Sequence, residues 1–178
     1  MSANQQALFM ATSASVPGLA LTNLGIGGTS VTTLVSVPAG CLIVVGFRGS
    51  TAPTDSAGNT YTLAKTVSSP GGSALFLYYC ANCLALPSGS TITATGGSVI
   101  TAAFTGGILA ASPLDQAVSA SGTSTTPSVT SGVPAESGEL WIGIMALDTT
   151  ATLTNPTGYS PPLDSPMVGV VISGNKIA

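Results

Sequence analysis

The feature that most limits the fold of this chain is an alternation between short apolar runs and turn-forming clusters. Runs of strand length, rich in Val, Ile, Leu and Thr, are separated by Gly, Pro, Ser and Asn clusters such as Ser69–Ser73 and Leu86–Ser90. Short strands joined by tight turns produce this pattern, and no useful length of chain has the apolar spacing of a helix. The clearest strands are predicted at Ser30–Val37, Cys41–Phe47, Thr60–Val67, Ala74–Cys80, Ser90–Thr95, Val99–Thr105, Leu114–Ser121, Glu139–Leu147 and Met167–Ser173.

The predicted fold is therefore all-β, with about ten short strands in an antiparallel β-sandwich whose connections are Ig-like or jelly-roll-like Greek keys. Two runs, Cys41–Phe47 and Glu139–Leu147, are apolar almost throughout and are expected to be central strands. Residues 1–29 are predicted to be an N-terminal arm, or a first strand, with a flexible connector. Residues 30–178 are predicted to be one sandwich domain.

Composition excludes several classes of protein. Hydrophobic residues make up 44% of the 178 residues, which argues against disorder, while charged residues make up only 5%. With three cations and a net charge of −3, the chain has no basic patch for nucleic acid or anionic lipid. No apolar run reaches the roughly 18 residues that would span a bilayer. The first residues lack the pattern of a secretory signal, so we expect use without Sec export or a removed leader.

Catalysis is not expected. The chain contains no His, which excludes Ser/His/Asp and Cys/His nucleophiles. A pair of carboxylates could still hydrolyse a glycoside, but every acid lies beside Gly, Pro or Ser at a strand end or in a turn. The acids are Asp55, Asp115, Glu136, Glu139, Asp148 and Asp164. We predict no enzyme and no cofactor.

The cysteines resemble a redox or zinc motif in spacing only. Cys80 and Cys83 form a CxxC, but the strand-to-helix context of a redox motif is missing, and Cys41 alone cannot complete a zinc site. We expect buried thiols, with a strained local Cys80–Cys83 bridge left open.

The stretch from Thr51 to Lys65 holds the most concentrated polar residues. Asp55 and Asn59 are suited to calcium, yet the repeated spacing of an EF-hand loop is absent, and no metal is predicted. A turn is favoured, with Asp55 and Asn59 bonding backbone amides and Gly58 left-handed. Tyr61 is expected in the core or on a sheet face. The candidate interaction loop is Asp55, Asn59 and Tyr61.

Several segments together resemble a known module. They are the apolar strand after Pro38–Gly40, the turn at Asp55–Thr60 followed by Tyr61, and the sequences LYY, SPLDQ (Ser112–Gln116) and ELWIGI (Glu139–Ile144). This succession, over about Ser30 to Ile172, resembles a β-sandwich module of phage virion proteins and large bacterial surface proteins. The module binds or decorates and has no shared active site.

The resemblance implies a non-enzymatic virion protein, such as a capsid decoration or cement protein, head fibre or tail accessory protein. Its partners would be other virion proteins and copies of itself, with no nucleic acid or membrane. The alternative is a glycan-binding or adhesin module of a bacterial surface or secreted protein. Sugar binding by such a module would depend on the few Tyr and Trp residues of the chain. Such modules usually end with one more strand than this chain. That strand is missing, replaced by the N-terminal segment QQALFMATS, or supplied by a neighbour.

Overall fold

We describe a computed structural model of the chain. The described residues are 5–12, 21–68, 74–96, 99–105, 113–123, 129–130, 132, 140–147 and 170–177. Within these ranges all regular elements are strands and no helix occurs, so the all-β prediction is confirmed. In the same ranges there is accordingly no helix able to cross a membrane.

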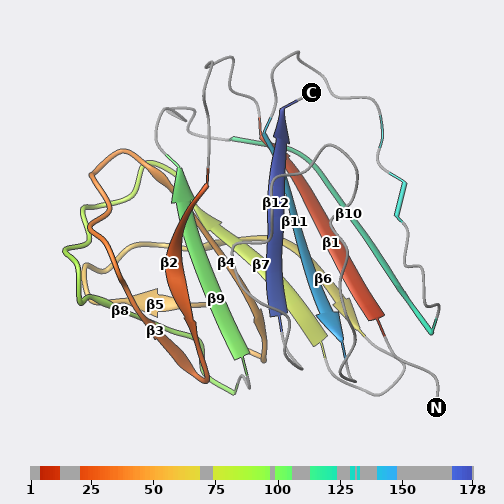
Figure 1. Cartoon of the computed structure of the whole chain (residues 1–178), viewed down its shortest axis with the longest axis horizontal. Coiled ribbons are helices and arrows are strands. Elements are labelled where there is room, and N and C mark those ends of the chain that lie inside the picture. The colour runs from red at the N-terminus through yellow and green to blue at the C-terminus, as the bar shows by residue number, and fades with distance from the viewer. Residues whose placement is uncertain are drawn as a thin grey trace.

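Twelve strands are present in the described ranges (Figure 1). They are β1 (Gln5–Thr12), β2 (Thr22–Gly27), β3 (Ser30–Thr32), β4 (Leu42–Arg48), β5 (Thr54–Asp55), β6 (Thr62–Ser68), β7 (Ala74–Cys80), β8 (Thr91–Thr93), β9 (Val99–Thr105), β10 (Leu114–Gly122), β11 (Leu140–Leu147) and β12 (Val170–Ile177). All strand pairs are antiparallel.

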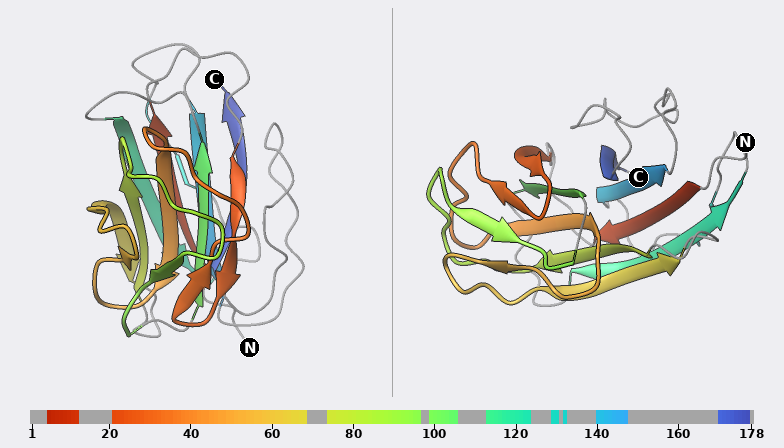
Figure 2. Two further views of the ribbon diagram at one scale, coloured as in Figure 1. Left: turned by 90° about the vertical axis from the view of Figure 1, so that its left-hand side faces the viewer. Right: turned by 90° about the horizontal axis from the view of Figure 1, so that it is seen from below.

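The strands form three sheets. A four-stranded sheet has the order β10-β1-β11-β12, a five-stranded sheet the order β2-β9-β4-β7-β6, and a three-stranded sheet the order β3-β8-β5. Figure 1 shows the three-stranded sheet on the side of the molecule away from β1, β10 and β11. Figure 2 shows the two larger sheets as layers lying over one another. Strand β10 lies beside β6, and β12 lies beside β9 and β4.

The five-stranded sheet is covered on both of its faces. On one face, Leu42 and Val44 of β4 belong to a first core cluster that also contains Ile142 and Ile144 of β11. On the other face, Ile43, Val45 and Phe47 of β4 belong to a second cluster, which also contains buried residues of β2, β3 and β8. Every residue from Leu42 to Phe47 is buried, which explains why this run is apolar without alternation.

Strand β7 divides its side chains between the same two clusters. Leu75, Leu77 and Tyr79 belong to the first cluster, whereas Phe76, Tyr78 and Cys80 lie with the second. The Phe47 ring stacks on Phe76 with centroids 5.5 Å apart and on Tyr78 with centroids 5.8 Å apart. Offset stacking of this kind adds to the free energy gained by burying the rings.

The N-terminal residues take part in both larger sheets. Strand β1 is an inner strand of the four-stranded sheet, and β2 is an edge strand of the five-stranded sheet. The N-terminal segment predicted as an arm or first strand thus lies within a sheet, between β10 and β11 and not beside β12. Strand β2 begins in a Gly-rich segment with a weak strand signal, and its pairing with β9 shifts register between Asn23 and Gly25, where Gly25 has φ +136°.

Because β4 has apolar neighbours on both faces, shortening one of its side chains should lower the stability of the fold. We expect Ile43→Ala to lower the free energy of unfolding by about 2 to 4 kcal/mol, since it removes a fully buried side chain and leaves a cavity. Urea unfolding followed by fluorescence would measure this. The control is Leu63→Ala on β6, where the side chain is 43% exposed and the change should stay within about 1 kcal/mol. Equal effects at the two positions would contradict the double burial of β4.

Candidate functional site

The candidate interaction loop connects the three-stranded sheet to β6. Asp55 ends β5, where it pairs with Ile92 of β8, and the chain then turns over Ser56–Gly58 toward Tyr61. The Gly58 amide donates to the Asp55 carbonyl at 3.3 Å. Gly58 has φ +79°, a left-handed conformation that favours Gly. The predicted turn, with its left-handed Gly58, is confirmed.

The Asp55 carboxylate organises this turn by accepting four hydrogen bonds. Its Oδ1 accepts from the backbone amides of Ala57 at 2.9 Å and Asn59 at 3.1 Å. Its Oδ2 accepts from Asn59 Nδ2 at 2.8 Å and from the Tyr61 hydroxyl at 2.8 Å. A carboxylate offers about four acceptor positions, so this one is fully engaged.

Asn59 joins the loop to a distant part of the chain. Its Oδ1 accepts from the Leu84 amide at 2.6 Å, and its Nδ2 also approaches the Leu84 carbonyl at 3.4 Å. The Ser56 amide donates to the Thr91 carbonyl at 3.2 Å. Residues 55–59 are thereby held against residues 84–91, which the sequence order does not reveal.

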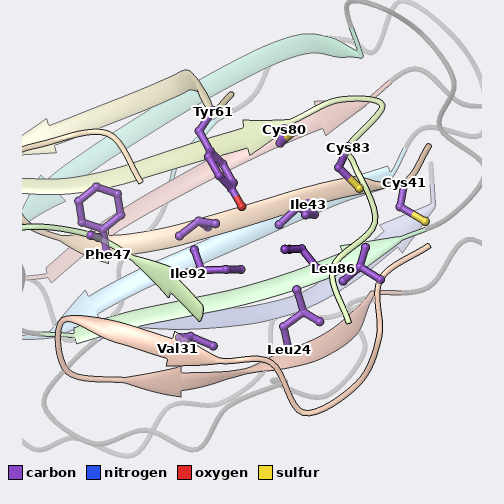
Figure 3. Packing of buried hydrophobic residues seen from close by; sticks show 13 residues of the cluster. Leu24, Val31, Cys41, Ile43, Phe47, Tyr61, Cys80, Cys83, Leu86 and Ile92 are labelled. Carbon is purple, nitrogen blue, oxygen red and sulfur yellow. The ribbon is translucent and has the colours of Figure 1, made fainter. Parts of the chain in front are cut away.

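The Tyr61 side chain connects the loop to the hydrophobic core. Its side chain is buried in the second cluster, as expected for a core position, and Figure 3 shows its hydroxyl oxygen directed into the cluster. Burial, together with donation to the Asp55 carboxylate, raises the pKa of Tyr61 well above its ordinary value. Partial burial alone would raise the pKa of Asp55, but the hydrogen bonds from Asn59, Tyr61 and the Ala57 amide outweigh it and lower that pKa.

The hydrogen bonds within the loop leave its three candidate side chains little capacity to bind a partner. Asp55 and Asn59 are half-buried and Tyr61 is buried, so the three candidate residues mainly hold the turn. The exposed residues of the loop are Thr54, Ser56, Gly58 and Thr60. A partner meeting this loop would contact hydroxyl groups and backbone first.

The three cysteines lie together in the second core cluster as free, buried thiols. Figure 3 shows them at one end of the cluster, with Phe47 toward the other. The Cys83 amide donates to the Cys41 carbonyl at 3.0 Å, which brings residue 41 beside the CxxC. Burial, with smaller effects from the neighbouring thiols, raises the pKa of Cys83 to about 11, so the reactive thiolate is scarce. The expectation of buried thiols is confirmed.

Within the described residues, no group of three or more His, Cys, Asp or Glu is placed to hold a metal. Asp115 lies on β10, and the other predicted acids, Glu136, Glu139, Asp148 and Asp164, fall outside the described residues. Among side chains that the structure describes, no aromatic ring is exposed, and Trp141 is buried as expected.

Sequence reasoning missed an exposed apolar surface on the outermost layer. Residues 30–41 run antiparallel to residues 83–93, joined by the β3–β8 pairing, by the Thr33 amide donating to Ser90, and by the Val37–Leu86 bridge. We call this pair of segments the outer ribbon. Its inner side chains belong to the second cluster, while Leu34 (68% exposed), Val35 (40%) and Leu84 (56%) face solvent.

The outer ribbon contains no Asp, Glu, Lys or Arg, as the sequence alone shows. On the adjoining strand β2, Ile26 is also 51% exposed. The Leu34 amide donates to the Leu24 carbonyl at 3.0 Å, which attaches the ribbon to β2. The signal that could have identified this surface was the lack of charged side chains in residues 1–47 and 66–114, which contain both segments of the ribbon and β2.

Comparison of the chain with family models, curated proteins and solved structures gave no match.

If the Asp55 bonds hold the turn, Asp55 and Tyr61 should be energetically coupled. We expect Asp55→Ala to lower the free energy of unfolding by about 2 to 3 kcal/mol and Tyr61→Phe by about 1 kcal/mol. The double variant should cost less than the sum, because both changes remove the same bond. Denaturant unfolding would measure the cycle, with Ser56→Ala at an exposed position as control. Strict additivity would contradict the coupling.

The lowered pKa of Asp55 also predicts a pH dependence. A carboxyl with a depressed pKa contributes stability above its unfolded pKa, and this is lost as the pH falls through the folded value. The wild-type chain should therefore lose stability below about pH 4, and Asp55→Asn should flatten this part of the profile. Thermal unfolding between pH 6 and pH 2 would measure both. Parallel profiles for the two proteins would show that Asp55 does not titrate with folding.

Proposed function

We propose that this chain is a non-enzymatic structural protein of a phage particle, acting by protein–protein assembly as a capsid decoration, head-fibre or tail accessory protein. The virion assignment comes from the resemblance of residues 30–172 to modules of phage virion proteins. Its partners would be other virion proteins and copies of itself. We also infer that the two larger sheets form an Ig-like or jelly-roll-like sandwich with Greek-key connections, a proposal supported by their shared first cluster.

The observation that carries the assembly proposal is the exposed apolar surface of the outer ribbon. Of the five large hydrophobic side chains exposed in the described residues, four lie on the ribbon or on β2 beside it. Single exposed hydrophobic residues are ordinary, and the proposal rests on four of them lying on the ribbon or on the adjoining β2. Leu63 on β6 is the exception.

Burial of this surface by a partner would be favourable for two reasons. Leu34 and Leu84 are more than half exposed, and each Å² of apolar surface removed from water contributes about 25 cal/mol. The ribbon carries no ionic side chain, so contact there desolvates no charge of its own. The net charge of −3 must be located elsewhere on the chain.

A glycan-binding function has less support from the described residues. Flat sugar faces would need exposed aromatic rings, whereas Tyr61, Tyr79 and Trp141 are buried. Phe76 and Tyr78 are half-buried, and both rings stack on Phe47. Assembly through aliphatic side chains is therefore preferred to carbohydrate binding.

The experiment targets the ribbon directly. We expect Leu34→Ser with Leu84→Ser to weaken self-association, or binding to phage capsids or tails, by about tenfold to a hundredfold, since about 1.4 kcal/mol corresponds to tenfold. Light scattering after size exclusion and capsid co-sedimentation would measure this. Leu63→Ser is the matched control, because it also removes an exposed Leu but from β6, and it should leave association unchanged. A monomer that binds no virion component would overturn the proposal.

A further inference from the structure

Strand β1 fills a slot between two strands that are consecutive among those described. Gln5–Thr12 pairs antiparallel along its whole length with β10, from Gly122 to Leu114, and also with β11, from Leu147 to Leu140. Strands β10 and β11 do not pair with each other. Figure 1 shows β1 lying between them.

The four-stranded sheet is incomplete without this strand. Among the described strands, β1 is the sheet neighbour through which β10 joins the four-stranded sheet, while β11 also pairs with β12. Withdrawing β1 would expose the facing backbone amides and carbonyls of β10 and β11, and unpaired groups of this kind recruit another strand. The slot therefore needs an occupant, and the sequence that fits it is Gln5–Thr12.

Strand β1 is joined to the other described strands on one side only. It is the first described element, and β2 is its neighbour along the chain. Eight residues, 13–20, separate it from the described residues that begin at Leu21. A connection of this length spans at most about 30 Å when fully extended.

We propose that β1 is exchanged between copies of this chain, each copy inserting its Gln5–Thr12 strand into the β10–β11 slot of a neighbour. The pairs that β1 makes within its own chain would all be formed between chains, so the two arrangements differ mainly in entropy. A short linker holds β1 near its own slot at an effective concentration in the millimolar range. Exchange then requires copies packed at comparable local concentration.

This inference rests on the proposed function, because assembly on a particle supplies such local concentration. The connection length requires that exchanging copies adjoin one another. A second copy is the occupant of choice because its β1 has the register already observed. The first 47 residues contain no charged side chain, so bringing these segments together involves no like-charge repulsion between side chains.

Disulfide trapping tests the exchange in the full-length chain. Ala7 of β1 lies opposite Ala120 of β10 in the register, a position where two cysteines can form a bridge. One chain would carry Ala7→Cys and a second, tagged to differ in size, would carry Ala120→Cys. The two would be co-expressed and oxidised with a small disulfide such as oxidised glutathione, which is reduced to two thiols as each protein bridge forms. The native cysteines are buried in the second cluster.

Exchange predicts a mixed disulfide dimer on a non-reducing gel, with a yield that rises with protein concentration. The control pairs Ala7→Cys with Thr32→Cys, an exposed position on β3 in the outer layer. A mixed dimer no more abundant than this control, with an intrachain bridge in the Ala7→Cys, Ala120→Cys double variant, would overturn the exchange. If light scattering then still shows an oligomer, the assembly function stands without it. If it shows a monomer at all concentrations, the exchange fails, and the assembly function then stands or falls on the binding to capsids or tails.

Discussion

The structure depends on the burial of the five-stranded sheet on both faces. Strand β4 lies at its centre, with Leu42 and Val44 in one apolar cluster and Ile43, Val45 and Phe47 in the other. Hydrophobic burial is the main favourable term in folding, and a chain with few charges relies on it more than most. The four-stranded sheet and the outer ribbon are each held to the molecule through this shared middle layer.

The polar interactions of the described residues are concentrated where the outer layer meets the middle one. In a chain with 5% charged residues, the Asp55 carboxylate accepts four hydrogen bonds, and Asn59 bonds to the backbone of Leu84. Charge-assisted bonds in a partly buried turn fix geometry that apolar packing alone leaves loose. The polar loop from Asp55 to Tyr61 therefore mainly holds the outer layer against the middle layer.

Two features of the described residues carry the proposals on assembly. The outer ribbon exposes Leu34 and Leu84 to solvent and has no charged side chain, and β1 joins β10 to β11 in the four-stranded sheet. The ribbon leaves apolar surface that a neighbouring copy can cover, and the pairs that β1 makes are ones that the β1 of a neighbouring copy can also make. They lie in different parts of the fold, the ribbon on the outer layer and β1 in the four-stranded sheet.

The sequence by itself determined the local properties of this protein. A strand overlaps each predicted range, although β3 covers only Ser30–Thr32 and β12 extends to Ile177. The absence of His excluded the common nucleophiles, and Gly58 with Asp55 and Asn59 predicted the turn. These features depend on residues close in sequence. Tertiary structure alone decided the insertion of β1 between β10 and β11, the third layer over β4, the contact of Asn59 with Leu84 and the exposure of Leu34. Each depends on pairing between distant segments, which local propensity does not encode.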